Sequence, residues 1–136
     1  MGFLDKTIEK TKATTKSMSS KFNEGKDANK IESQIKAEKQ KVRDLYETIG
    51  KEYYRWTYDG DESHKECFDS LVSQINQSRK TIEDLEAQLD EIRNKGKEER
   101  DNIKAEHDAK MEEIEAADAE AKAEKERIKK EKDDTF

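Results

Sequence analysis

The chain has 136 residues, of which 46% are charged and 30% hydrophobic, with no proline and a net charge of −6. An average domain is only about 25% charged, so this chain cannot bury enough apolar surface for a compact core. The composition leaves long helices that meet along narrow faces, or disorder. The acidic net charge argues against a general nucleic-acid binder, and we expect no nucleic-acid partner.

The cysteine count and the hydropathy argue against disulfide-bonded, zinc-binding, membrane-spanning and secreted proteins. Cys67 is the only cysteine, so neither an intrachain disulfide nor a multi-cysteine zinc site is expected. No stretch approaches the roughly 20 apolar residues of a membrane span, and Met1 to Leu4 is too short an apolar run for a signal peptide. We therefore expect a cytoplasmic protein, or one held peripherally at the inner face of the membrane.

Residues 1–26 form a segment rich in Thr, Ser and Lys, and residues 1–27 carry a net charge of +2. At helical spacing, one face of this segment collects four threonines and five large apolar residues, with lysines beside them: Phe3, Leu4, Ile8, Met18 and Phe22. The pattern repeats every eleven residues, the period of a helix with about 3.67 residues per turn. A weak apolar face flanked by lysines is typical of a helix that lies on an anionic membrane.

The five apolar residues are therefore predicted to face a membrane. Two alternatives remain open for this segment. One is docking onto the hairpin, and the other is a frayed, soluble leader, because Thr and Ser are poor helix formers.

Residues 28–96 are predicted to form an antiparallel helical hairpin, a coiled coil with its tip near residues 58–63. We expect a break at Gly25 and Asp27, a first helix over about 28–57, and a second helix after Ser63. Apolar residues three and four apart mark one face of each helix. These are Ala28, Ile31, Ile35, Val42, Leu45, Ile49, Tyr53 and Trp56 in the first helix, and Phe68, Leu71, Ile75, Ser78, Ile82, Leu85, Leu89 and Ile92 in the second.

The two faces can be paired residue by residue about one centre, Glu62. The pairs run from Trp56 with Phe68 to Ile35 with Leu89, and Ala28 is expected to meet Gly96 at the base. Because two independent patterns share one centre, this pairing is the strongest structural inference that the sequence offers.

Residues 97–132 consist almost wholly of Glu, Lys, Asp, Ala and Arg, and predict one long charged helix that continues from the hairpin after a kink near Gly96. A thin stripe, out of phase with the hairpin, runs through Ile103, His107, Ile114, Ala121 and Ile128. We expect this helix to be exposed or to pair with a second copy, and residues 133–136 to fray. The predicted fold class is all-α.

The sequence contains no Gly-rich phosphate loop, no nucleophile elbow and no metal-ligand cluster. His64 and Cys67 share one helical face, which suits a metal ligand pair. The simpler interpretation is a solvated His64, with Cys67 packed beside Phe68. A two-helix hairpin also lacks the concave pocket that acid–base catalysis requires. We expect no catalytic residue, no cofactor and no metal, and hence not an enzyme.

The stretch Ile49 to Phe68 holds the only tryptophan and three of the four tyrosines. Bulky rings there can plug the open end of a hairpin, or form an exposed Tyr/Trp/Arg cluster of the kind that binds a protein. Tyr54, Arg55 and Tyr58 lie off the paired face and are predicted to contact a protein partner.

The start MGFLDKTIEKTKATTK and the stretch KIESQIKAEKQKVRDLYETIGKEYYRW resemble the N-terminal region of a family of bacterial, mostly Gram-positive, coiled-coil proteins. Those proteins carry an "IGKxYY"-like patch and often a C-terminal zinc ribbon. The resemblance covers residues 1–95 and implies an amphipathic start followed by a coiled-coil hairpin. The tail lacks paired cysteines, so zinc binding is not implied, and the family lends no established activity.

In organisation alone, the chain is also similar to the phage-shock and vesicle-inducing membrane-remodelling proteins, although residues 23–27 replace their proline-containing linker. We predict a non-enzymatic coiled-coil protein that acts through self-association and partner binding. A homodimer that forms a four-helix bundle is expected, because a hairpin of about 65 residues has little core. The alternative is a peripheral membrane protein anchored by its N-terminal amphipathic helix.

Overall fold

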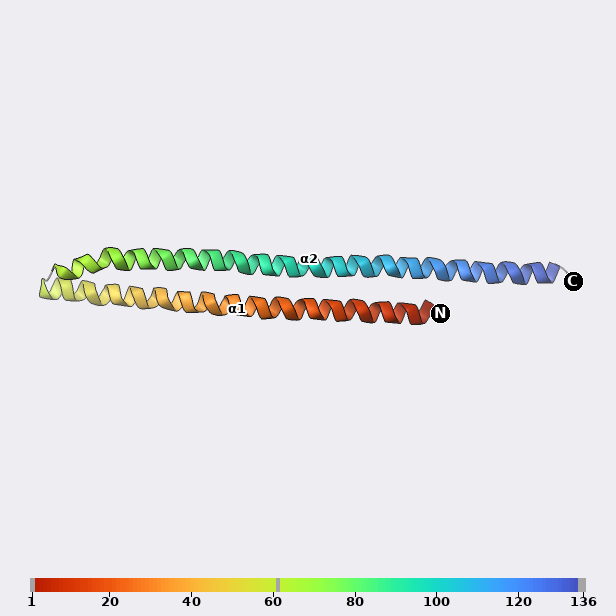
Figure 1. Ribbon diagram of the computed structural model, residues 1–136, viewed down its shortest axis with the longest axis horizontal. Coiled ribbons are helices and arrows are strands. Elements are labelled where there is room, and N and C mark those ends of the chain that lie inside the picture. The colour runs from red at the N-terminus through yellow and green to blue at the C-terminus, as the bar shows by residue number, and fades with distance from the viewer. Residues whose placement is uncertain (1, 61, 135–136) are drawn as a thin grey trace. The chain divides into compact units, whose positions relative to one another are not determined.

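A computed structural model describes residues 2–60 and 62–134, which form two helices, α1 (Gly2–Asp59) and α2 (Ser63–Asp134). Of the described residues, only Gly60 and Glu62 lie outside these helices. The two helices pack against each other as an all-α helical hairpin, which confirms the predicted fold class (Figure 1). The chain divides into two compact units, residues 24–94 and residues 2–23 with 95–134, and each is described by itself.

The break predicted at Gly25 and Asp27 is wrong, because α1 is helical through both residues. Helix α2 continues as one helix through Gly96, as the sequence predicted. A glycine inside a helix costs only about 1 kcal/mol relative to alanine, and the chain contains no proline to remove a backbone donor. Residues that pack against the other helix lie on both sides of each glycine, so a single weak position does not end the helix.

The turn of the hairpin depends on Gly60, whose φ of 67° lies in the left-handed region. Its N–H donates a hydrogen bond to the carbonyl oxygen of Trp56 at 2.9 Å, which caps the end of α1. A side chain at residue 60 would strain this conformation. Helix α1 therefore extends to Asp59, two residues beyond the predicted end, and Tyr58 lies in the helix instead of the turn.

In the unit of residues 24–94, the half-buried and buried positions follow a spacing of seven residues. On α1 they include Ala28, Ile31, Ile35, Glu38, Val42, Leu45, Ile49, Glu52 and Trp56, and on α2 they include His64, Phe68, Leu71, Ile75, Ser78, Ile82, Leu85, Leu89 and Ile92. Ala28, Ile35, Leu85 and Leu89 form the apolar core cluster of this unit. The prediction fails at one position, because Glu52 occupies the buried face and Tyr53 is 56% exposed.

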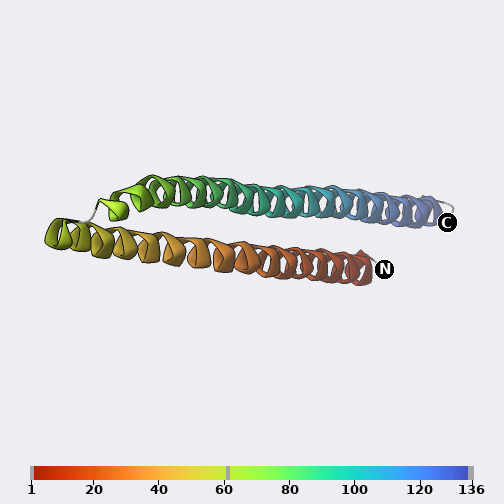
Figure 2. The ribbon, with the colours of Figure 1, turned by 60° about the vertical axis from the view of Figure 1, so that its left-hand side comes forward.

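Contacts between the helices in this unit agree with the pairing predicted about Glu62. The rings of Trp56 and Phe68 lie with their centroids 6.1 Å apart. An ion pair joins Arg93 to Glu32 at 2.6 Å. A longer pair joins Lys39 to Glu86 at 3.9 Å. The helices run antiparallel beside each other, as Figure 2 shows, so the centre inferred from the apolar pattern also locates the polar contacts that flank it.

In the unit of residues 2–23 with 95–134, the packing follows a spacing of eleven residues. The buried and half-buried positions of α1 are Gly2, Lys6, Glu9, Ala13, Ser17 and Ser20, so that Gly2 recurs at Ala13, Lys6 at Ser17 and Glu9 at Ser20. On α2 they are Gly96, Arg100, Ile103, His107, Lys110, Met111 and Ile114. An eleven-residue spacing fits helices of about 3.67 residues per turn.

The N-terminal segment thus docks on the charged tail, whereas the docking alternative left open from the sequence placed it on the hairpin. Ion pairs join Lys6 to Glu115 and Lys110 to Glu9, each at 3.6 Å. The predicted stripe of the tail is half-buried at Ile103, His107 and Ile114, whereas Ala121 and Ile128 are exposed. The buried and half-buried positions of α2 step by four from Ile92 to Gly96 and by four again to Arg100, whereas steps of four and three alternate from His64 to Ile92.

Beyond Ile114, every described residue of α2 is exposed. The helix includes Asp133 and Asp134, where the sequence predicted fraying, and residues 135 and 136 lie outside the described part of the chain.

Replacement of Val42 by alanine tests the buried face of the hairpin. Val42 is 9% exposed, so Val42→Ala should lower the free energy of unfolding by about 2 kcal/mol through lost burial and a small cavity. Val72 lies in the same unit but is 48% exposed, and Val72→Ala should cost less than about 0.5 kcal/mol. Urea unfolding followed by circular dichroism measures both variants, and equal losses would contradict the assigned face.

Candidate binding surfaces

The first candidate surface is the N-terminal apolar face, which consists of Phe3, Leu4, Ile8, Met18 and Phe22. All five side chains are exposed, from 53% at Ile8 to 81% at Phe3. They lie outside the row of small and polar residues by which α1 packs on α2, although Ile8 also borders the groove between the two helices. The segment therefore uses its polar side for the intramolecular contact and leaves its apolar side in solvent.

The threonines between these apolar residues add to the same surface. The hydroxyl of Thr7 donates a hydrogen bond to the carbonyl oxygen of Phe3, and the hydroxyl of Thr11 donates to that of Thr7, both at 2.9 Å. Thr14 makes the equivalent bond to Lys10 at 2.9 Å. Because these hydroxyl donors are satisfied within the helix, the threonines present their methyl groups at low polar cost.

Positive charge flanks the N-terminal apolar face. Lys10, Lys12, Lys16 and Lys21 are all exposed. Lys6 instead lies on the packed side, where it pairs with Glu115. Glu9, an acidic residue on the packed side of this segment, pairs with Lys110, which partly neutralises its negative charge.

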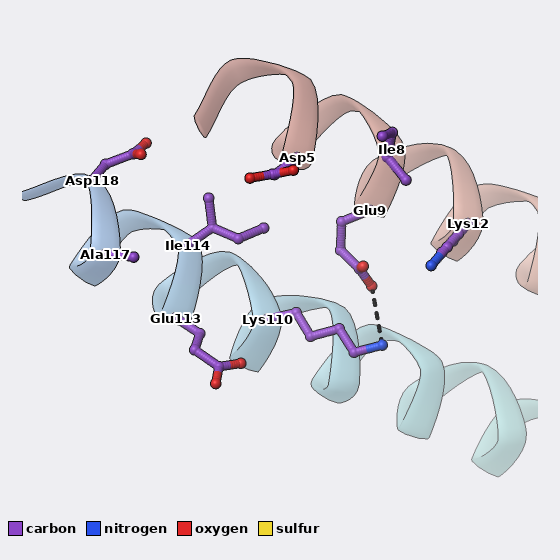
Figure 3. A pocket seen from close by; sticks show the side chains of 9 residues that line it. All are labelled: Asp5, Ile8, Glu9, Lys12, Lys110, Glu113, Ile114, Ala117 and Asp118. Carbon is purple, nitrogen blue, oxygen red and sulfur yellow. Dashed lines mark ion pairs between the residues drawn. The ribbon is translucent and has the colours of Figure 1, made fainter. Parts of the chain in front are cut away.

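A groove of about 460 Å³ lies between the first turns of α1 and the tail of α2 (Figure 3). Figure 3 shows the ion pair between Glu9 and Lys110 crossing the groove near Lys12, with Ile114 on the opposite helix. The lining consists of Asp5, Ile8, Glu9, Lys12, Lys110, Glu113, Ile114, Ala117 and Asp118. Most of these side chains are carboxylates and lysines, so the groove is mainly charged.

Among the described residues of this contact, two buried polar atoms have no hydrogen-bond partner. Ser20 Oγ and His107 Nδ1 are buried without a hydrogen-bond partner. Such an atom costs about 1–3 kcal/mol. The attachment of the N-terminal segment to the tail is therefore weak for its length.

The second candidate surface is the hairpin tip, with the predicted contact residues Tyr54, Arg55 and Tyr58. All three are exposed, and the rings of Tyr54 and Tyr58 stack with centroids 5.9 Å apart and planes 10° from parallel. Arg55 Nη1 donates to Glu52 Oε1 at 3.2 Å. The structure therefore brings the three residues together on one side of α1, away from the packed rings.

The remaining aromatic residues plug the open end of the hairpin. Tyr53 and Phe68 both contact the ring of Trp56 edge to face, with centroid distances of 5.8 and 6.1 Å. The ammonium group of Lys65 lies over the Trp56 ring at 5.9 Å. Tyr53 belongs to this cluster although it is half-exposed, so the plug and the exposed tip are separate surfaces.

His64 is half-buried and lies 2.6 Å from Glu52 through its Nδ1 atom, a contact that the sequence analysis missed. The seven-residue spacing that places Glu52 on the paired face is the signal that would have found it. Cys67 is exposed instead of packed beside Phe68. Among the described residues, no group of three or more His, Cys, Asp or Glu side chains could hold a metal ion.

The hydropathy of the helices and a comparison with known proteins both bear on the class of protein. Within residues 2–60 and 62–134, neither helix contains a stretch long and apolar enough to cross a membrane. Comparison with protein-family models, curated proteins and solved structures finds no match. The resemblance to the bacterial coiled-coil family therefore stays a prediction.

The only tryptophan makes the aromatic plug directly measurable. Phe68→Ala removes one of the rings that cover Trp56, so its fluorescence maximum should move to longer wavelength as water reaches the indole. Tyr58→Ala, which removes an exposed ring outside this cluster, should leave the maximum unchanged. Identical spectra for both variants would show that Phe68 does not shield Trp56.

Proposed function

We propose that the protein is not an enzyme and that it acts by binding an anionic membrane surface through an amphipathic helix at residues 2–23. The observation that carries this proposal is the exposure of five large apolar side chains on the side of α1 that does not pack on α2. The intramolecular contact already uses the opposite side, so membrane binding needs no rearrangement of this unit.

The expected free energies of apolar burial and of charge attraction fit reversible membrane binding. Full burial of a Leu, Ile, Met or Phe side chain is worth about 1.5–3 kcal/mol, and insertion to the depth of the headgroups gives part of this. Each lysine close to an anionic surface adds about 1 kcal/mol. Lys10, Lys12, Lys16 and Lys21 are exposed beside the apolar face. The acidic tail opposes this attraction, so salt and lipid charge should both modulate binding.

The proposed location is the inner face of the cytoplasmic membrane, in a bacterium if the resemblance holds. Anionic lipids there give the surface a negative potential that attracts basic segments. A protein partner that covers the same five residues is the competing occupant, and the flotation experiment below separates it from lipid.

Flotation with vesicles tests the membrane proposal. The full chain should float with vesicles containing phosphatidylglycerol and less with purely zwitterionic vesicles, and binding should weaken as salt rises. The double variant Phe3→Ser/Phe22→Ser should stay at the bottom, because it removes two exposed anchors without touching the packed side. The matched control Val72→Ser/Ile128→Ser removes two exposed apolar residues outside both candidate surfaces and should float like the unmodified chain. Equal flotation of both double variants would sink the proposal.

A second candidate function is self-association as a coiled-coil interaction protein. No described side chain is less than 2% exposed, so the hairpin has no fully buried large residue to stabilise it. Tyr46, Tyr54, Tyr58 and Val72 are exposed in the unit of residues 24–94. A dimer, most simply one that forms a four-helix bundle, would bury more apolar area per chain than the hairpin does alone.

Light scattering tests self-association. The chain has a mass of 15.9 kDa, and the expected solution mass is twice that value. A monomeric mass together with a cooperative thermal melt would mean that the hairpin is stable alone, and the self-association proposal would then be wrong.

A further inference from the structure

An exposed row of residues runs along α1 near the hairpin tip at intervals of four: Tyr46, Gly50, Tyr54 and Tyr58. We call these four residues the tyrosine row. The half-buried positions of α1 in this region are Ile49, Glu52 and Trp56, so the tyrosine row faces away from α2. Residues four apart form one of the natural ridges by which helices pack against each other.

Gly50 has no role in the fold of the single chain. It lies inside α1 with no positive φ, and a Cβ atom built on it would meet nothing within 4 Å. Glycine is among the worst helix formers, so an alanine here would favour the helix. The absence of a side chain leaves a notch in the ridge between Tyr46 and Tyr54, which suits the close approach of a second helix.

We propose that a second copy of this chain packs on the tyrosine row, antiparallel and centred on Gly50. This inference rests on the self-association proposed above and names the surface that carries it. The two copies would share a two-fold axis near Gly50, so the same patch serves both. Each notch would then admit the helix of the partner, with tyrosines of both copies on either side.

In an antiparallel pair centred on Gly50, the residues around Gly50 of one copy face complementary residues of the other copy. Tyr46 lies as far before Gly50 as Tyr54 lies after it, so Tyr46 is level with Tyr54 of the partner subunit. Arg43 lies within one residue, about 1.5 Å along the axis, of the level of Tyr58 of the partner subunit, which suits a guanidinium group over an aromatic face. Glu47, which pairs with Lys51 at 3.0 Å within one helix, also comes close to Lys51 of the partner subunit.

Charge favours a second copy over the other occupants. Residues 43–58 contain three basic and three acidic side chains, so this stretch is neutral on a chain with a net charge of −6. Two copies can therefore meet here without the repulsion that would oppose contact between their acidic tails. An anionic membrane gains no net attraction from a neutral patch, and a foreign protein would leave the unmodified chain monomeric.

Sedimentation equilibrium on the full chain tests the surface with a matched pair of glycine variants. Gly50→Leu fills the notch and should raise the dissociation constant of the dimer by roughly tenfold or more, the effect of a lost hot-spot contact. Gly25→Leu makes the same change at another position of α1 where a Cβ atom meets nothing, and should change the dissociation constant less than about twofold. Thermal melts should show that both variants are as helical as the unmodified chain, because leucine is the better helix former.

The outcomes separate the two levels of the proposal. A monomeric unmodified chain overturns self-association and this surface together. A dimer that Gly50→Leu and Gly25→Leu weaken equally, or not at all, overturns only the tyrosine row. As a second variant, Glu47→Lys should weaken the dimer, and the exchanged pair Glu47→Lys/Lys51→Glu should restore it. Failure of the exchange to restore association would contradict the antiparallel arrangement about Gly50.

Discussion

The pairing of α1 with α2 has to be built from very few apolar side chains, and the two units meet this constraint differently. In residues 24–94, Val, Ile and Leu recur every seven residues, and the helices exclude water along an apolar face. In residues 2–23 with 95–134, the spacing is eleven residues, and Gly2, Ala13, Ser17 and Ser20 allow contact through their small size instead. The first unit is stabilised by burial, and the second by close approach and by two ion pairs.

This division frees the apolar side of the N-terminal segment. Had Phe3, Leu4 and Ile8 packed on the tail, no large apolar face would remain on residues 2–23. They are exposed instead. The other side of the segment packs on the tail, and Ser20 Oγ is buried in that contact without a hydrogen-bond partner. The tip of the hairpin separates its roles in the same manner. Trp56 and Phe68 close the hairpin, whereas Tyr54 and Tyr58 stack in solvent.

Much of the hairpin could be predicted, because a burial pattern repeated on both helices fixes their pairing about Glu62. The prediction chose the aromatic Tyr53 for the paired face, although the seven-residue spacing from Leu45 marks Glu52, which contacts His64 across the turn. It also suggested a break at Gly25, because local propensity takes no account of packing on either side. The exposure of Phe3 and Phe22 was compatible with the predicted membrane face. The packing of Ser17 and Ser20 on the tail was invisible, because small polar residues give no apolar signal.

The central claim is that one side of residues 2–23 holds the tail while the opposite side remains available to lipid. A polarity-sensitive fluorophore attached to a single cysteine tests it most directly, in a Cys67→Ser background with Met18→Cys or Lys16→Cys. Both positions are exposed, but only Met18 belongs to the N-terminal apolar face. On addition of phosphatidylglycerol vesicles, the label at residue 18 should shift to shorter wavelength and the label at residue 16 should shift much less. Equal shifts at both positions, or none at residue 18, would contradict the account.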